Sequence, residues 1–255
     1  MTTILAPLLA GVVLASTTPI DETRLVDLTH AFDEDTIYWP TARRFHLDRV
    51  AHGRTEAGYW YAANDFCAAE HGGTHLDAPL HFAENRWAAA DVPLERLMGP
   101  AVVVDVALRA AASADVLVSV GDLEAFERAH GRIRAGTVVL LRTGWASRWG
   151  DAGRYLGSTA PGDASNLHFP GLGKDAAAFL VERRIDAVGI DTASIDHGPS
   201  RTFDAHRVLA AANVPIFENL ANLDRLPATG AWVIALPMKI AGGSGGPLRA
   251  VAVLP

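Results

Sequence analysis

The chain has 255 residues, of which 49% are hydrophobic and 20% are charged, as in an ordinary soluble globular protein. Its net charge of −7 and its lack of a basic run argue against a nucleic-acid-binding surface. Cys67 is the only cysteine, which excludes an intrachain disulfide and any C-x-x-C metal or redox motif. Functions that need a basic surface or paired cysteines are therefore excluded.

Residues 1–24 form an apolar extension ahead of the rest of the chain. Ile4–Ser16 is about as long as a secretion-signal core, but no Lys or Arg precedes Arg24. The run is also too short to span a bilayer, which needs about 20 residues. We expect a helix that docks on the domain or on a partner subunit, in a cytoplasmic protein without a membrane span. A cleaved signal on a periplasmic or secreted protein is the alternative.

Apolar, β-branched runs predict strands that are buried on both faces. They are Ala101–Leu108, Thr137–Arg142, Asp186–Asp191, Trp232–Pro237 and Arg249–Leu254. Three segments between them have helical patterns, namely Asp122–His130, Lys174–Arg184 and Arg201–Asn213. Gly131 is expected to end the first helix, and Ser200 to cap the third. Strands that alternate with helices predict an α/β fold with a parallel or mixed sheet, in one domain over residues 25–255.

Two glycine-rich segments are expected to lack regular structure. Gly150–Gly173 is rich in Gly, Ser and Pro, and a long loop of this kind is often a lid or a binding loop. GGSGGP, residues Gly242–Pro247, lacks the Lys-Ser/Thr of a phosphate-binding loop. We expect a tight turn there, just before the last strand.

The stretch EHGGTHLDAPLHF, residues 70–82, contains four metal-capable side chains. They are His71, His75, Asp77 and His81. A straight strand would hold the first and third of these roughly 20 Å apart, so the chain must fold back to bring them to one ion. The glycine pair supplies backbone angles that are closed to other residues. A helical H-x-x-x-H site of the zinc-protease kind fails, because glycine replaces the catalytic glutamate and Gly-Gly-Thr is a poor helix interior.

The side chains of His71, His75 and Asp77 suit Zn²⁺, Mn²⁺ or Fe²⁺ better than Ca²⁺ or Mg²⁺. Three protein ligands leave a coordination position for water, which is typical of catalytic sites. His81, just beyond them, is suited to move protons, because an ordinary histidine titrates near neutrality. Hydrogen-bonded structural histidines are the alternative, but four such groups around a glycine pair favour a metal site.

The same stretch resembles the H-x-G-T-H-x-D-x-P-x-H signature of the metal-dependent cyclase-like hydrolases, the family of bacterial kynurenine formamidase and isatin hydrolase. Other segments are similar to family blocks in family order, from about Leu25 onward. They are IYWP (Ile37–Pro40), LLRTGW (Leu140–Trp145), FPGL (Phe169–Leu172), GIDTASID (Gly189–Asp196), FENLANLD (Phe217–Asp224) and PMKIAGGSGGPLRAVAV (Pro237–Val253). The resemblance implies a swivelling β/β/α cyclase-like fold with a mixed sheet and flanking helices, in a homodimer or larger homo-oligomer.

The resemblance also implies roles for individual residues. It implies that His71, His75 and Asp77 bind the metal and that His81 is the catalytic acid/base. In the formamidase branch a His and a Glu that match His206 and Glu218 help to hold a second zinc, whereas the isatin hydrolase branch has one manganese. Mn²⁺ is favoured, Zn²⁺ is the alternative, and the number of ions stays open. From the residues alone, His206 also fits a buried structural histidine, and Glu218 a solvated loop residue.

Tyr59–Glu84 and Asp191–Asp224 are more similar to isatin hydrolase than to kynurenine formamidase. We therefore expect hydrolysis of a small cyclic aromatic amide, isatin to isatinate, by metal-activated water, with His81 moving the proton. Trp39 and Trp60 are the candidates to stack on the flat ring, with core packing as the alternative. N-formylkynurenine hydrolysis and a non-catalytic metal-binding protein are the competing functions. A serine or cysteine hydrolase is disfavoured, because no helix is expected after the glycine-rich GGSGG segment, as a nucleophile elbow requires, and Cys67 has no obvious base beside it in sequence.

Overall fold

The structure is a computed structural model that describes residues 21–158, 160 and 162–255. The apolar helix expected within residues 4–16 lies outside these described residues, so the domain boundary near residue 24 stays a prediction. The described part of the chain begins with a short 3₁₀ helix, Glu22–Arg24. No helix within the described ranges is long and apolar enough to cross a membrane.

Eight strands form the main sheet. They are β1 (Leu25–Asp27), β4 (His75–Asp77), β5 (Met98–Asp105), β7 (Val138–Arg142), β9 (Ala187–Ile190), β10 (Ile216–Glu218), β11 (Thr229–Pro237) and β12 (Gly245–Val253). Their order is β1-β12-β11-β5-β7-β9-β10-β4, and β4 pairs with β12 as well, so the sheet closes on itself. The pairs β5–β7, β7–β9 and β9–β10 are parallel, and the others are antiparallel. The predicted α/β class with a mixed sheet is confirmed.

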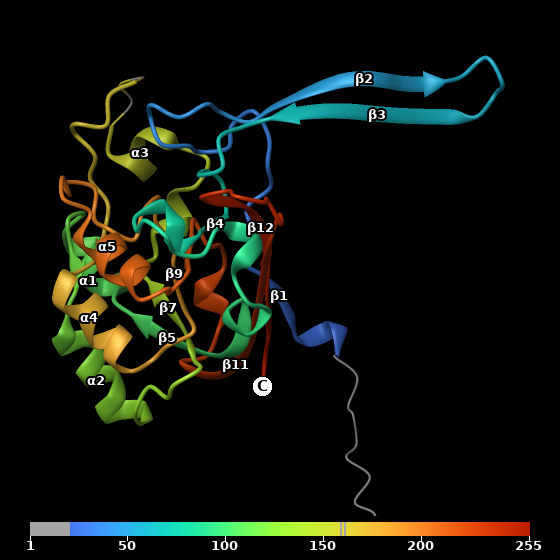
Figure 1. Ribbon diagram of the computed structural model, residues 1–255. Helices are drawn as coiled ribbons and strands as arrows, with labels where there is room; N and C mark the ends of the chain where they lie inside the picture. Colours follow the sequence, from blue (N-terminus) through green and yellow to red (C-terminus); the bar gives the residue numbers. More distant parts are fainter. Residues whose placement is uncertain (1–20, 159, 161) are drawn as a thin grey trace, which may run out of the picture.

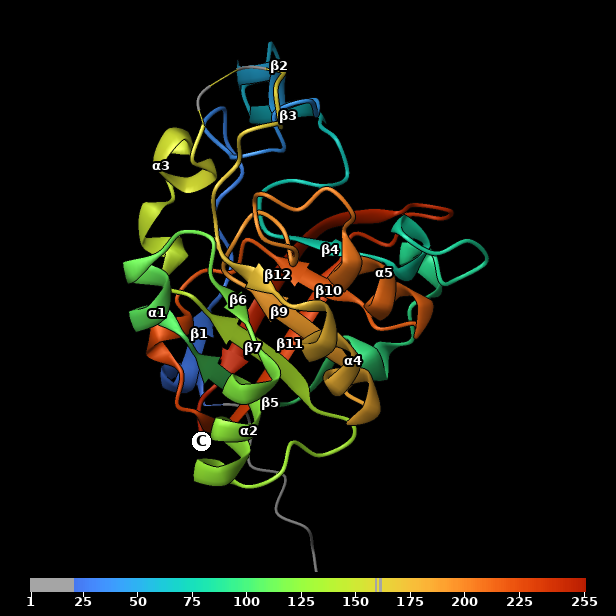
Figure 2. The same cartoon turned by 90° about the vertical axis from the view of Figure 1, so that its left-hand side faces the viewer.

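Side-chain alternation along the central strands builds two cores. Leu140 packs inside the closed sheet, whereas its neighbour Leu141 packs on the outer face, under the helices. The helices over this face are α2 (Val120–His130), α4 (Lys174–Glu182) and α5 (Asp204–Ala211), as Figures 1 and 2 show. Strands with both faces buried consist almost entirely of apolar residues, which is why β7 and β9 were predictable.

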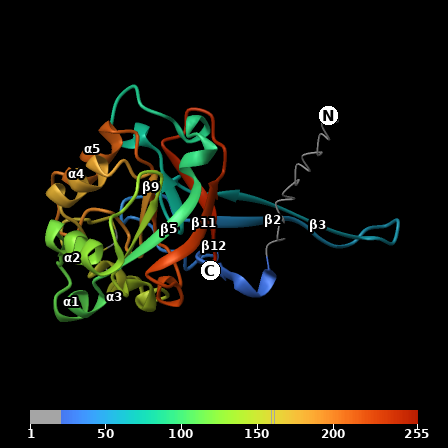
Figure 3. The ribbon, with the colours of Figure 1, turned by 90° about the horizontal axis from the view of Figure 1, so that it is seen from below.

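The outer face of β11 and β12 lies on the side of the sheet away from these helices (Figure 3). Trp232 and Leu236 of β11 remain 47% and 42% exposed there. A hairpin of β2 (His46–Arg54) and β3 (Trp60–Cys67) forms a separate two-stranded sheet that projects from the body on the same side (Figures 1 and 3). No strand was predicted here, because both faces of the hairpin mix charged and apolar residues.

Four predicted strand boundaries are wrong by three or four residues. Strands β5 and β11 begin at Met98 and Thr229, each three residues before the predicted start. The strand expected over Ala101–Leu108 ends at Asp105, whose side chain accepts the N–H of Ala107 (2.9 Å) and starts the short helix α1, Ala107–Ala112. The last strand begins at Gly245 rather than Arg249, since the second half of the expected GGSGGP turn pairs with β4 and extends β12.

Two helix starts also differ from the prediction. Ser119 caps α2, and Asp122, the expected first residue, instead accepts the N–H of Ser119 (2.7 Å) as part of a capping box. Helix α5 begins at Asp204, not directly after Ser200, because the Ser200 hydroxyl accepts the N–H of Phe203 (3.1 Å) one turn earlier. Helix α4 ends at Glu182, close to its expected end.

The expected loop Gly150–Gly173 contains regular structure after all. Helix α3 (Ala152–Leu156) lies within it, and β8 (Gly171–Leu172) pairs with β6 (Leu117–Val118). Tyr155 of α3 is fully buried, and its carbonyl accepts the indole N–H of Trp145 (2.7 Å). This buried aromatic contact holds the segment on the body, so most of it is not an open lid.

Candidate functional site

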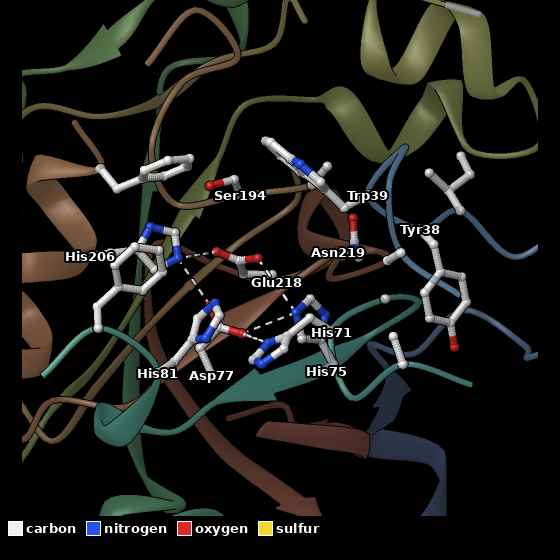
Figure 4. A pocket seen from close by; sticks show the side chains of 17 residues that line it. Tyr38, Trp39, His71, His75, Asp77, His81, Ser194, His206, Glu218 and Asn219 are labelled. Atoms are coloured by element: carbon white, nitrogen blue, oxygen red, sulfur yellow. Dashed lines mark hydrogen bonds and ion pairs between the residues drawn. The ribbon is translucent and has the colours of Figure 1, made fainter. Parts of the chain in front are cut away.

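A cavity of about 310 Å³ opens beside β4, β10 and α5 (Figure 4). Polar side chains line one part of it: His71, His75, Asp77, His81, Ser194, His206, Glu218 and Asn219. The rest is mainly apolar or aromatic: Ile37, Tyr38, Trp39, Ala42, Ala69, Gly72, Phe82, Ala193 and Phe203. Thus every predicted metal or catalytic residue lines the same cavity.

The glycine pair folds the chain between the first two histidines. Gly73 has a left-handed backbone (φ 58°), and Gly72 pairs with Tyr38 in an isolated β-bridge. A Cβ on Gly72 would lie 2.0 Å from the Tyr38 ring, so a side chain has no space there. The expected reversal of the chain at this pair is therefore present, and it leads directly into β4.

His81 reaches the site through a 3₁₀ helix. Pro79 begins this helix, and His81 ends it. The His81 ring stacks on His71, with ring centroids 3.8 Å apart and 20° between the planes. Partial burial lowers the pKa of His81 to about 4, and although Asp77 raises it, the neighbouring imidazoles lower it further. The ring is therefore neutral near pH 7 and able to accept a proton.

His206 and Glu218 lie close to Asp77 and to each other. Glu218 ends β10 and lies opposite His75 in the antiparallel β10–β4 register. His206 projects from α5, and its Nε2 is 3.0 Å from Asp77 Oδ2 and 3.2 Å from Glu218 Oε1. Both side chains are buried, so Glu218 is not the solvated loop residue that the sequence also allowed, whereas the burial of His206 fits both of its interpretations.

In three of the histidines, one ring nitrogen makes a hydrogen-bond contact with an oxygen on the side away from Asp77. The contacts are His75 Nδ1 to the Gly73 carbonyl (3.0 Å), His206 Nδ1 to Asp196 Oδ2 (2.7 Å) and His71 Nε2 to Ser244 Oγ (2.8 Å). Their other nitrogens converge on Asp77, at 3.1, 3.0 and 2.6 Å. When such a ring is neutral, its inner nitrogen presents a lone pair to the Asp77 carboxylate, and a cation between the two would remove their repulsion.

The pKa directions agree with this requirement. Burial raises the pKa of Asp77, but charge and hydrogen bonds from the imidazoles outweigh it and hold that pKa well below its usual range. Burial lowers the pKa of His206, yet Asp196, Asp77 and Glu218 raise it well above its usual value. The His206 ring therefore binds its second proton tightly, and a divalent cation at this position would displace that proton.

The donor set fits a divalent metal. His71, Asp77 and His81 offer ligand atoms within 4.8 Å of one another, and so do His75, Asp77 and Glu218. Asp77 belongs to both groups, so it stands at the centre of the site (Figure 4). Nitrogen and carboxylate ligands together suit zinc, manganese or iron.

The two tryptophans have different environments. Trp39 lines the cavity, and its ring lies 6.4 Å from that of Phe203 and 6.4 Å from that of Phe169. Trp60 lies on β3, is 59% exposed and packs its edge against His52. The structure does not bring Trp60 to the cavity of its own chain, because the hairpin carries it away from the body. Of the two tryptophans expected to stack on the substrate ring, only Trp39 therefore lines the cavity of its own chain.

Several residues of the site escaped the sequence reasoning. Asn219 directly follows the buried strand β10, and Ser194 lies in the loop after β9, which ends at Ile190. A polar residue just after a buried strand is a usable signal. Phe82 and Phe203 carry no comparable signal, because an aromatic residue fits a core equally well. Ser244 is distant in sequence from every other site residue, so only the fold reveals it.

The chain was compared with known proteins. The Cyclase family model ("Putative cyclase") matches residues 26–197. The chain belongs to the cyclase family. It is 36% identical to isatin hydrolase of Roseibium aggregatum over 206 residues, which cover 78% of this chain and 77% of that protein. The family resemblance of the motif is confirmed.

Three further cyclase-family relatives support this assignment. Isatin hydrolase A from Ralstonia solanacearum has a solved structure with a TM-score of 0.82 and 34% identity, covering 91% of this chain and 92% of that chain. Kynurenine formamidase of Sphingopyxis alaskensis is 29% identical over 228 residues, covering 89% of this chain and 97% of that protein. Both named branches of the family are thus represented, and a kynurenine formamidase of Paracidovorax citrulli reaches 34% identity over 193 residues, covering 72% of this chain and 76% of that protein.

Proposed function

We propose that this cyclase-family chain hydrolyses a small cyclic aromatic amide and converts isatin to isatinate. The observation that carries the proposal is the cavity itself, where His81 and the metal-type donors around Asp77 lie beside the aromatic side chains of Trp39, Phe82 and Phe203. A flat aromatic ring fits against such side chains, while its amide faces the polar groups. The similarity to isatin hydrolases supports this choice of substrate.

The cofactor proposed is one divalent metal held by His71, His75 and Asp77, with Mn²⁺ favoured and Zn²⁺ as the alternative. When bound, such an ion would polarise the amide carbonyl and lower the pKa of the attacking water. His206 and Glu218 hold Asp77 in place from the other side, or bind a second ion as in the formamidase branch.

His81 is the proposed proton carrier. Its neutral imidazole takes the proton of the attacking water and returns it to the departing amide nitrogen. The stacked His71 ring orients it. Trp39 and Phe203 orient the aromatic part of the substrate, so that the carbonyl faces Asp77 and its histidines.

Turnover of the metal-loaded protein tests both the substrate and the role of His81. Once elemental analysis has established the bound metal, we expect faster turnover of isatin than of N-formylkynurenine. His81→Ala should lower kcat on isatin by about 10²–10⁴-fold with the metal content unchanged. The control is His130→Ala, at an exposed histidine at the end of α2, which should leave kcat unchanged.

Other results would favour the competing functions. Faster turnover of N-formylkynurenine would make the chain a kynurenine formamidase, to which the buried His206 and Glu218 pair also points. Binding of the metal without turnover of either substrate would favour a non-catalytic metal-binding protein. If the His81→Ala variant hydrolysed isatin at the wild-type rate, His81 would not be the proton carrier.

The chain is further proposed to act as a homo-oligomer through the β2–β3 hairpin. An isolated two-stranded hairpin is only marginally stable in water. This one exposes a group of large apolar side chains: Leu47, Val50, Tyr59, Trp60, Tyr61 and Phe66. A second copy is the occupant that fits, because the hairpin and the open β11 face lie on the same side of the body (Figures 1 and 3). Two copies can exchange hairpins there, and a stable interface typically involves about 20–30 residues on each side.

A further inference from the structure

The glycine-rich segment Gly242–Pro247 lies against the metal site, although its sequence suggested only a turn. A Cβ on Gly243 would lie 2.7 Å from Glu70 Oε1, and a Cβ on Gly245 would lie 2.6 Å from His71 Cε1. These two glycines therefore provide space rather than unusual backbone angles. They allow the segment to enclose Glu70 and His71 at close range.

Ser244, between these two glycines, links Glu70 to His71. Its backbone N–H and its hydroxyl both contact Glu70 Oε2, at 2.9 and 2.6 Å. The hydroxyl must donate its single hydrogen in the contact with the carboxylate, so its oxygen is left to accept. That oxygen is 2.8 Å from His71 Nε2, which therefore carries the hydrogen and donates it.

We propose that Ser244 and Glu70 are positioning residues that hold His71 in its Nε2–H form, with the lone pair of Nδ1 directed at the metal site. Nδ1 lies 2.6 Å from Asp77 Oδ1, where the other ligands converge. Neither Ser244 nor Glu70 lines the cavity, so both act through His71. This inference rests on the metal site of the proposed function.

Loss of the Ser244 hydroxyl leaves His71 Nε2 without its protein partner. The ring can then exchange its hydrogen between the two nitrogens, and only one of the two forms can bind a metal through Nδ1. Removal of an outer hydrogen-bond partner of a ligating histidine typically weakens metal affinity by about 10–100-fold. His81 is affected in turn, because it stacks on the His71 ring.

The test titrates Mn²⁺ and Zn²⁺ into the full-length metal-free protein in competition with a chelator. Ser244→Ala and Glu70→Gln should weaken affinity by about 10–100-fold, and Ser244→Thr, which keeps the hydroxyl, should restore it. Ser147→Ala is the matched control, because this exposed serine donates to the Gly144 carbonyl (2.8 Å) and does not line the cavity. Its affinity should equal that of the wild type.

A second measurement detects directly which ring nitrogen of His71 carries the hydrogen. Long-range ¹H–¹⁵N NMR spectra of the metal-free protein should show a hydrogen on His71 Nε2 in the wild type and a mixture of ring forms in Ser244→Ala. Unchanged affinity together with an unchanged ring spectrum in Ser244→Ala would overturn the proposal, and so would a wild type that binds neither metal. Neither measurement uses substrate, so failure to hydrolyse isatin would count against the proposed function alone.

Discussion

At the scale of single residues, His30 shows how burial controls charge outside the catalytic group. Its ring stacks flat on Trp149, with ring centroids 4.0 Å apart and 8° between the planes. Nε2 is buried without a hydrogen-bond partner among the residues that the structure describes. Burial lowers the pKa of His30 to about 4, although Asp27 opposes this shift. The folded protein therefore keeps this imidazole neutral.

This shift predicts a pH dependence of stability. An unfolded histidine titrates near 6.5, so between pH 6.5 and about 4 the unfolded chain binds the additional proton. The free energy of unfolding should therefore fall as the pH falls through this window, by at most about 3 kcal/mol from His30. His30→Phe keeps the stacking and should lose less stability between pH 7 and pH 4.5 in urea unfolding. Equal losses in wild type and variant would refute this role of His30.

At the scale of elements, the segment from His71 to His81 combines a turn, a strand and a 3₁₀ helix within a few residues. Gly73 makes the turn, β4 presents His75 and Asp77, and Pro79 begins the helix that returns His81 to His71. Each part depends on its neighbour for position, since β4 has only three residues and is held by β10 and β12. The geometry of the site thus depends on tight packing around the glycine pair.

Gly72→Ala tests this packing. The new methyl group would overlap the buried ring of Tyr38, so the free energy of unfolding should fall by about 1–3 kcal/mol. Gly53→Ala on β2 is the matched control, because nothing lies within 4 Å of its added Cβ. Thermal unfolding of both variants should show a lower Tm only for Gly72→Ala. Equal Tm values would mean that the Tyr38–Gly72 contact is not tight.

At the scale of the whole molecule, the closed sheet and the hairpin have different roles. The pairing of β12 with β4 brings the C-terminal segment to the candidate site, and the helices cover one side of the sheet. The hairpin projects from the other side (Figure 1), where the β11 face is also exposed. A body with one uncovered apolar face and a projecting apolar arm is typical of a protomer.

Charge substitutions on the arm test the oligomer. Trp60→Glu should lower the molar mass measured by light scattering to that of one chain, because it places a charge in the proposed interface. Leu108→Glu, at a 91% exposed residue on α1, is the control and should keep the wild-type mass. A wild type that is monomeric at micromolar concentration, or a Trp60→Glu protein of unchanged mass, would rule out this interface.

Much of the central sheet and the metal motif could be predicted from sequence, because each leaves a local pattern. Strands β7 and β9 appear as short apolar runs, since both of their faces are buried. The hairpin escaped prediction, because its strands are exposed on both faces and have no apolar period. The starts of α2 and α5 were misplaced by two and three residues, because caps depend on the hydrogen bonds that Ser119 and Ser200 make.

The fold class, the family and the metal-type residues near Gly72 and Gly73 were predictable, because they depend on local composition and spacing. The distant groups that complete the site were found only in the folded chain. Ser244 contacts His71 across 173 residues of sequence, and His206 contacts Asp77 across 129. Trp60, by contrast, is carried away from the cavity on the hairpin. Such contacts depend on how the sheet closes through β4, β10 and β12, and no local pattern in the chain encodes that closure.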